Sequence, residues 1–463
     1  MIETYNITDL LISPIVLLLI LIIAWIYATK KQEKHPEYKY YFRGLILKLL
    51  GAFSIWYIYT FYYPGGDTKE YYAAALATLE LLYKNPAGFF SVWLGAHDLK
   101  KLTLFLGVGG TPGYYRDPNS FFVVRVIIPF VFISFKSYLV CAFLLATVSF
   151  FGVWKLFSVY VKEYPDISGK FAIALFYVPS VFFWGSGILK DTITFSMVSI
   201  FVASFYKIFI RRNQIRKNFI WLIIATYFII SIKPYIFIGL IPGSLFWIIN
   251  RILSGIRGQI IRFVSAPILI LLISSFGYLL LYSMEQSLGH YTFENVLKHA
   301  AEVQRDLKSD YYRGNSFDIG DYDPTVGAML LKAPAAINVA LFRPYIWEAN
   351  NLVMILSSIE NMVILLLTIV VLIRTRLLLW VKYLPNNHLL TFSIIFSLFF
   401  AFSVGISASN FGSMVRYKIP AIPFFISSCF IIQYLWKKEK NAISSLKLQN
   451  TIVEANSLTS ITT

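Results

Sequence analysis

Trp184-Gly-Ser-Gly-Ile-Leu-Lys190-Asp191 interrupts two apolar runs that together extend from Phe171 to Ile210. This stretch places an ammonium and a carboxylate side by side where the chain must turn between two membrane helices. A lysine or an aspartate at the centre of a bilayer costs about 2.5 to 3.5 kcal/mol on insertion scales. We therefore expect the pair at a membrane face or in a water-filled cavity, and the turn is the first candidate site.

The composition of the whole chain indicates a membrane protein. Of the 463 residues, 57% are hydrophobic and only 14% are charged, and the mean hydropathy is +0.66. These values are typical of a polytopic protein and exclude a soluble class. The net charge of +17 is a topology signal rather than a sign of nucleic acid, because the basic residues fall mostly in short loops between apolar runs. Cys141 and Cys429 lie inside apolar runs, so neither a disulfide framework nor a cysteine metal site is indicated.

The sequence predicts an all-α polytopic membrane protein with about 11 transmembrane helices, each formed by an apolar run of roughly 15 to 25 residues. The predicted spans are Leu11–Ala28, Leu45–Tyr63, Tyr138–Phe157, Phe171–Trp184, Thr192–Ile210, Phe219–Ile232, Tyr235–Ile249, Phe263–Tyr282, Leu352–Ile373, Leu389–Ile406 and Ala421–Leu435. Residues 1–440 are interpreted as one transmembrane domain, and residues 441–463, rich in Ser, Thr and Asn, as a disordered cytoplasmic tail.

The charged loops predict the orientation. Clusters of lysine and arginine fall on one side of the predicted spans, which the positive-inside rule makes cytoplasmic. They contain Lys30, Lys31, Lys34, Lys39, Arg43, Arg211, Arg212, Arg216, Lys217, Arg251, Arg257, Arg262, Arg374, Arg376, Lys382, Lys437, Lys438 and Lys440. The N-terminus is then outside, the C-terminus is cytoplasmic, and the expected location is the cell (inner or plasma) membrane.

The apolar segment 121–135 contains Arg125 and Pro129 and is interpreted as interfacial or re-entrant. Counting it as a span would place the basic loop 211–217 outside. Two large loops, 64–119 and 284–350, are then left at the outer face. The first is expected to carry amphipathic segments.

Nearly every unusual polar residue falls at that outer face. Asp67 follows the exit Pro64-Gly-Gly, with Glu70 three residues later, and Asp191 opens the helix after the Trp184 turn. Each aspartate has a simpler interpretation, because acidic residues commonly cap helices after turns. Lys190 could likewise snorkel from the end of a span.

Further cations share this outer level, where the positive-inside bias disfavours them. They are Lys190, Lys233, Arg343, Arg416 and Lys418, beside the carboxylates Asp67, Asp191 and Glu348. Arg343 and Glu348 could also simply pair with each other. The sum favours a site for an anion beside carboxylates, and a lipid phosphate carries its charge at this depth. A carboxylate there could deprotonate an acceptor hydroxyl while cations stabilise a departing phosphate.

The acidic residue after an early span, the amphipathic stretch Phe89 to Leu106 and the Pro179 turn resemble the GT-C superfamily of polytopic glycosyltransferases. Protein O-mannosyltransferases and aminoarabinose transferases belong to it. The resemblance covers mainly Leu45 to Ile210, as an arrangement of spans. It implies that Asp67 is the catalytic base or a metal ligand. Many members place two acidic residues in or near this loop, whereas here Glu70 follows Asp67 by only three residues; Glu70, Asp191 and Glu348 are interpreted as supporting residues. It also implies a polyprenyl phosphate or diphosphate sugar as donor and a glycan, lipid or protein as acceptor.

A second resemblance, to O-antigen polymerases and ligases, rests on the late outer loop Met284 to Asn350 and on Arg343 and Arg416. It implies the same class of lipid-linked substrate. A lipid-linked oligosaccharide flippase or transporter is a third interpretation, for which Glu360 is the clearest carboxylate inside an apolar run. No cofactor is indicated with certainty.

The aspartates of the segment Ser316-Phe-Asp318-Ile-Gly-Asp321-Tyr-Asp323 could bind a divalent cation, but they lack the full calcium-loop spacing. A solvated acidic loop is the favoured interpretation of this segment.

Overall fold

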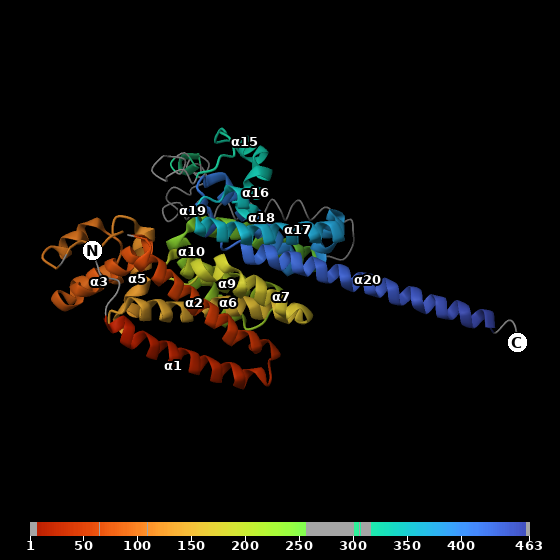
Figure 1. Cartoon of the computed structure of the whole chain (residues 1–463), viewed down its shortest axis with the longest axis horizontal. Helices are drawn as coiled ribbons and strands as arrows, with labels where there is room; N and C mark the ends of the chain where they lie inside the picture. The colour runs from red at the N-terminus through yellow and green to blue at the C-terminus, as the bar shows by residue number, and fades with distance from the viewer. Residues whose placement is uncertain are drawn as a thin grey trace.

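The computed structural model describes residues 7–63, 65–108, 110–255, 301–304, 306 and 316–459. These residues form helices joined by turns (Figure 1), and one isolated antiparallel bridge joins Ser316 to Asn410. The predicted span Phe263–Tyr282 and the first part of the predicted loop 284–350 lie outside the described residues.

Eight of the described helices are long and apolar enough to cross a membrane. They are α1 (Ile7–Gln32), α2 (Lys39–Phe61), α6 (Tyr138–Glu163), α9 (Lys190–Phe205), α10 (Ile215–Ile232), α11 (Pro234–Gly255), α17 (Leu352–Tyr383) and α18 (His388–Ser407). Helices α19 (Phe411–Tyr417) and α20 (Ile422–Thr459), bent by 62°, count as a ninth if the pair is one span. A helix satisfies its backbone hydrogen bonds internally, which a lipid environment requires. The chain is an all-α, multi-pass membrane protein.

Small residues allow these helices to pack closely. Helix α6 packs against α2 and α9, and a Cβ atom at Gly152 of α6 would collide with the backbone and side chain of Ser196 on α9. In the same way Gly405 of α18 lies against the backbone of Ala336 in α16 (Ala333–Phe342). Close backbone approach at small residues is the usual way in which membrane helices associate.

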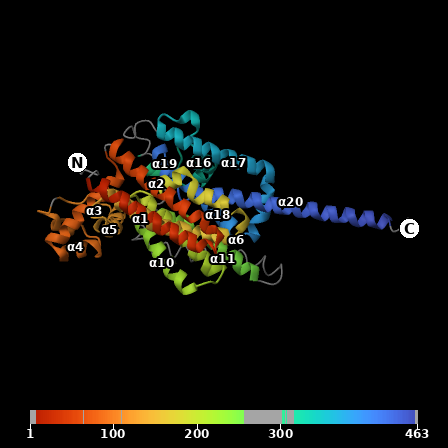
Figure 2. The same cartoon turned by 60° about the horizontal axis from the view of Figure 1, so that its bottom comes forward.

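Hydrogen bonds between helix ends define two ends of the bundle. At one end, called here the opposite end, Arg211 after α9 pairs with Glu163 at the end of α6, and Lys382 pairs with Glu439. At the other, called the cluster end, lie α3 (Asp67–Lys84), α4 (Pro86–Trp93) and the beginning of α9. Figures 1 and 2 show α3 at the end of the molecule that lies away from the C-terminus.

Helix α5 (Pro118–Ile133) belongs to the cluster end along its whole length. Near its start the Asn119 side chain donates to the Ser231 carbonyl at the end of α10, over 3.0 Å. Just after its end the Lys136 carbonyl accepts from Tyr72 of α3. Both neighbours lie at the same end of the bundle, which favours the interpretation of 121–135 as a segment that does not cross.

Two segments that link the ends are broken rather than continuous. The predicted span Phe171–Trp184 is divided into α7 (Ser168–Ala172), the π-helix η4 (Ile173–Tyr177) and α8 (Pro179–Trp184). The break falls at Pro179, which has no backbone N–H and forces Val178 into an extended conformation. The second break separates α19 from α20 beside Pro420.

The end of the chain differs from the sequence prediction. Residues 441–463 are predicted to form a disordered tail, whereas α20 continues as a helix to Thr459 (Figure 1). No glycine or proline interrupts Asn441–Thr459, and Ala, Leu, Lys, Gln and Glu among its Ser and Thr residues are good helix formers.

Candidate functional site

Arg416 joins two carboxylates that are far apart in the sequence. Its Nη1 atom donates to Oδ2 of Asp67 over 2.9 Å, and its Nη2 and Nε atoms donate to Oδ2 of Asp191 over 3.2 and 3.3 Å. The Lys233 ammonium donates to the other oxygen of Asp191 over 2.5 Å. We call Asp67, Asp191, Lys233 and Arg416 the Arg416 cluster; two anions and two cations meet there.

Each member stands at a helix terminus, and the termini bring them together. Asp67 is the first residue of α3, Asp191 the second of α9 and Arg416 the last but one of α19, while Lys233 lies between α10 and α11. The N-cap residues of α3 and α9 are Gly66 and Leu189. The capping interpretation of the two aspartates is therefore wrong for both, because their carboxylates face the cluster instead.

The exit from α2 needs its glycine to place Asp67. Gly66 has a φ of 137°, a conformation that side chains disfavour, and a Cβ atom there would collide with the Tyr59 ring. The tight turn from α2 into α3 therefore depends on Gly66.

The two carboxylates differ in their access to solvent. The side chain of Asp67 is 37% exposed, whereas that of Asp191 is 1% exposed. Tyr114 donates to the second oxygen of Asp67 over 2.7 Å. Burial acts to raise the pKa of Asp67, but the Arg416 charge and the Tyr114 hydrogen bond outweigh burial, so the pKa lies below its usual value. Asp67 is the carboxylate that a ligand can reach, and Asp191 is a buried anchor for the two cations.

Aromatic rings support both cations. The Arg416 guanidinium carbon lies 5.4 Å from the centroid of Trp184, and the Lys233 ammonium lies 5.4 Å from the centroid of Tyr417. Such cation–π contacts contribute about 0.5 to 2 kcal/mol each. Trp184, at the turn between the two apolar runs, thus contacts Arg416.

Lys190 borders the cluster and has a partner that the sequence analysis missed. Its ammonium lies 3.6 Å from Asp117, whose carboxylate also caps α5 through the Asn119 N–H. Burial acts to raise the pKa of Asp117, but its hydrogen bond from Ser120 and the Lys190 charge bring it below the usual value. An aspartate directly before Pro118 is a typical helix start, which could have drawn attention to Asp117. Nothing in the sequence singles out Tyr114.

Four other predicted site residues, Arg343, Glu348, Lys418 and Glu70, lie outside the cluster. Arg343 makes a two-pronged pair with Glu348, in which its Nε atom is 2.9 and 3.0 Å from the carboxylate oxygens. Arg343 and Glu348 therefore pair with each other, as the simpler interpretation of the sequence allowed. Burial acts to raise the pKa of Glu348, but the hydrogen bonds from Arg343 outweigh burial, so the pKa lies below its usual value. Lys418 is fully buried and donates to Asn361. Glu70 is exposed one turn beyond Asp67.

A polar contact also holds the break in the first broken segment, at Pro179. The Glu360 carboxylate of α17 accepts from the backbone N–H of Ser180 over 2.7 Å and from its hydroxyl over 2.6 Å. Glu360 thus fixes the beginning of α8, next to the turn that carries Trp184. The carboxylate predicted inside an apolar run has a local structural partner.

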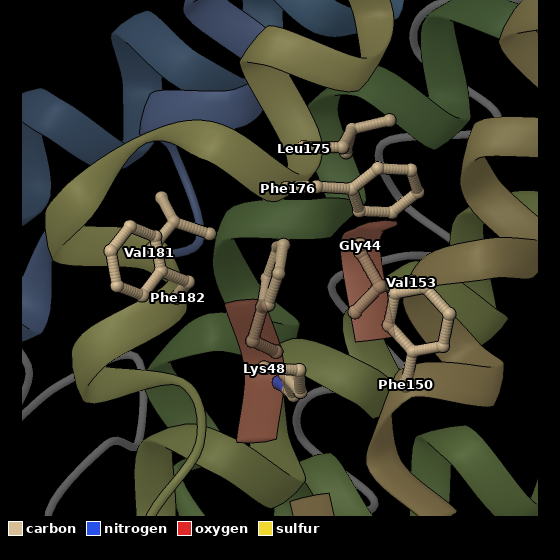
Figure 3. A pocket seen from close by; sticks show the side chains of 9 residues that line it. Gly44, Lys48, Phe150, Val153, Leu175, Phe176, Val181 and Phe182 are labelled. Atoms are coloured by element: carbon tan, nitrogen blue, oxygen red, sulfur yellow. The ribbon is translucent and has the colours of Figure 1, made fainter. Parts of the chain in front are cut away.

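Lys48 of α2 is a further buried cation that the sequence analysis passed over, although it interrupts a predicted span. Its ammonium donates to the Gly185 carbonyl at the end of α8. Figure 3 shows Lys48 beside a small cavity lined by Gly44, Phe150 and Phe182. Lys48 therefore ties α2 to the turn directly after Trp184.

Among residues 7–255 and 301–459, as far as they are described, no group of three or more His, Cys, Asp or Glu side chains is placed to hold a metal ion. Asp318 instead accepts from the Gly320 N–H over 2.8 Å. A divalent cation remains a prediction for this chain.

No family model, curated protein or solved structure matches this chain. Its function must therefore be inferred from the chemistry of the Arg416 cluster.

Proposed function

We propose that the chain is a membrane glycosyltransferase that moves a sugar from a polyprenyl phosphate or diphosphate donor to an acceptor at the outer face of the cell membrane. A role in the assembly of cell-surface polysaccharide or glycan fits this chemistry. The observation that carries the proposal is the Arg416 cluster itself, in which a guanidinium shared by two carboxylates lies at the ends of apolar helices.

The donor phosphate would bind the cations of the cluster end. Arg416, Lys233 and Lys190 gather at the termini of membrane helices, the depth at which a lipid phosphate is held while its chain stays in the bilayer. A guanidinium can grip two phosphate oxygens, and the ammonium groups add charge. Arg343 and Lys418 are not assigned to phosphate, because they contact Glu348 and Asn361 outside the Arg416 cluster.

Asp67 would act on the acceptor. A hydroxyl oxygen of the acceptor attacks the anomeric carbon, the bond from that carbon to the phosphate oxygen breaks, and the hydroxyl proton passes to the Asp67 carboxylate. The leaving polyprenyl phosphate takes the bonding electron pair and is stabilised by the cations. With its pKa below the usual value Asp67 is a weak base. If the donor phosphate binds Arg416 and draws it away from Asp67, the pKa of Asp67 rises and its carboxylate becomes a stronger base.

The second candidate is a transporter of lipid-linked sugars, and the two broken segments favour it. Transporters often build their sites where membrane helices are discontinuous, and here α8 and α19 both contact the cluster end through Trp184 and Arg416. An O-antigen polymerase or ligase would share the donor class of the main proposal. It would give Arg343 a direct role, whereas Arg343 pairs with Glu348.

Asp67→Asn tests the proposal most simply. General base catalysis contributes roughly 10²- to 10⁴-fold in rate, so the variant should lose about two or more orders of magnitude of sugar transfer while inserting normally. The matched control is Glu70→Gln, because Glu70 is an exposed carboxylate one turn along the same helix. Transfer of radiolabelled sugar from polyprenyl phosphate donors to membrane acceptors, with equal amounts of purified protein, provides the measurement.

Wild-type transfer rates in Asp67→Asn would remove Asp67 as the base and advance the polymerase alternative. Movement of a lipid-linked sugar across proteoliposomes, with no transfer by the wild-type protein, would favour the transporter.

A further inference from the structure

The opposite end of the bundle contains a cavity that the proposed function does not use. Its volume is about 480 Å³, and it lies between the turn that follows α1, the end of α6 and the π-helix η5 (Tyr206–Ile210) that ends α9. Small-molecule sites usually have volumes of about 300 to 1,000 Å³. The cavity is therefore large enough for an organic ligand.

Within the described residues, some of the basic side chains that line this cavity are paired with carboxylates, and others are not. Arg211 is held by Glu163, with Nε to Oε1 at 2.7 Å, and His35 lies 3.5 Å from Glu37. Lys162 and Lys207 also line it, and neither has a carboxylate within ion-pair distance in the described part of the chain.

The unpaired ammonium groups are more than a topology signal. A positive-inside loop requires only exposed lysines, whereas here two lysines from different helices line one concave site. Lys207 lies within the π-helix η5, an element that is rare and often marks functional sites.

The lining indicates the chemistry of the ligand. Two free ammonium groups suit a phosphate, whose oxygens accept charge-assisted hydrogen bonds. The carboxylates Glu37 and Glu163 can accept hydrogen bonds from ligand hydroxyl groups, and Tyr206 and Asn213 add further polar groups. In a phosphate attached to a small polyol, the phosphate would bind the ammonium groups and the hydroxyl groups would donate to the carboxylates.

We propose that this cavity binds a polyol phosphate through Lys162 and Lys207. The proposal is independent of the glycosyltransferase function, because the cavity lies at the end of the bundle away from the Arg416 cluster. The ligand is either the headgroup of an anionic phospholipid or a free polyol phosphate, and one experiment separates these sources.

The experiment measures binding to the full chain in neutral detergent. Native mass spectrometry detects bound dihexanoyl phosphatidylglycerol as the lipid probe, and isothermal titration calorimetry detects glycerol 3-phosphate as the soluble probe. The test variant is Lys162→Gln/Lys207→Gln. The control, Lys34→Gln/Lys438→Gln, removes the same charge from lysines outside the cavity lining.

The wild-type protein and the control should bind at least one probe. The test variant should bind that probe at least about tenfold more weakly, because it loses the charge-assisted hydrogen bonds from both ammonium groups. Binding of the lipid alone identifies a headgroup site, and binding of glycerol 3-phosphate identifies a soluble ligand. If the double variant does not fold, Lys162→Gln, which changes an exposed side chain, serves in its place with a weaker but measurable loss.

No binding of either probe to the wild-type protein would overturn the proposal. Equal affinity in the test variant and the wild-type protein would do the same, as would an equal loss in the control, which would assign the binding to net charge.

Discussion

The two ends of the helix bundle hold their charges in different ways. At the opposite end, ion pairs lie at the surface: the side chain of Arg211 is 49% exposed beside Glu163, and that of Lys382 is 56% exposed beside Glu439. At the cluster end, Arg416 is shared between two carboxylates, and one of them, Asp191, is 1% exposed.

This difference distinguishes charges that only orient the protein in the membrane from charges that form a site. Exposed lysines and arginines are enough to orient a membrane protein, whereas burying an ion pair carries a desolvation penalty of several kcal/mol per ion. The Arg416 cluster joins four segments that are far apart in the sequence, so local helix capping does not account for it. A function at the cluster end is the simplest reason to maintain such an arrangement.

The largest expected effect is all-or-none and concerns which end faces outside. Glu70→Cys should react with an impermeant maleimide added to intact cells, and Arg212→Cys should react only after the membrane is opened. Both substituted residues are exposed, one at each end, and the natural Cys141 and Cys429 are buried and should stay silent. Labelling of Arg212→Cys from outside would reverse the orientation and place the cluster in the cytoplasm.

The next effect compares the stability of the two ends. Arg416→Gln leaves Asp67 and Asp191 without their shared partner, and loss of one member of a buried ion pair lowers the free energy of unfolding by about 3 to 5 kcal/mol. Arg211→Gln at the opposite end breaks an exposed pair, which contributes about 0 to 1 kcal/mol. Denaturation of both purified variants in mild detergent measures the contrast. If both variants lost the same free energy of unfolding, the Arg416 cluster would stabilise the fold no more than a surface ion pair does.

A smaller effect concerns pH. The pKa of Asp67 is lower in the folded protein than its ordinary value of about 3.9. Its ionised form therefore stabilises the fold above the unfolded pKa, and this contribution is lost as the pH falls through the folded pKa. Asp67→Asn should remove that part of the acid-induced loss of stability. If the free energy of unfolding of Asp67→Asn fell with decreasing pH as steeply as that of the wild-type protein, Arg416 would not lower the pKa of Asp67.

Most of the helices could be predicted from the sequence because each is a long apolar run. Where the prediction failed, local chemistry overrode hydropathy. Pro179 divides the predicted span Phe171–Trp184 into separate helices, and hydropathy alone does not reveal this break. The helical continuation of α20 to Thr459 shows that a polar composition rich in Ser and Thr does not by itself prevent a helix.

For the site, the sequence could predict a shared depth but not the contacts. Asp67, Asp191, Lys233 and Arg416 each follow or precede an apolar run, so their common level could be inferred. Which cation meets which carboxylate depends on how the helix ends pack. For the same reason Arg343 could not be separated from Arg416 until its pairing with Glu348 was seen.

Arg416 is proposed to hold a lipid phosphate, and the binding of a polyprenyl phosphate to the purified protein tests this role. The comparison is between the wild-type protein, Arg416→Lys and Arg343→Lys, because lysine keeps the charge but loses the guanidinium fork. We predict at least about tenfold weaker binding by Arg416→Lys, from the loss of a charge-assisted hydrogen bond of about 1.5 to 3 kcal/mol, and unchanged binding by Arg343→Lys. Wild-type affinity in Arg416→Lys would contradict this role.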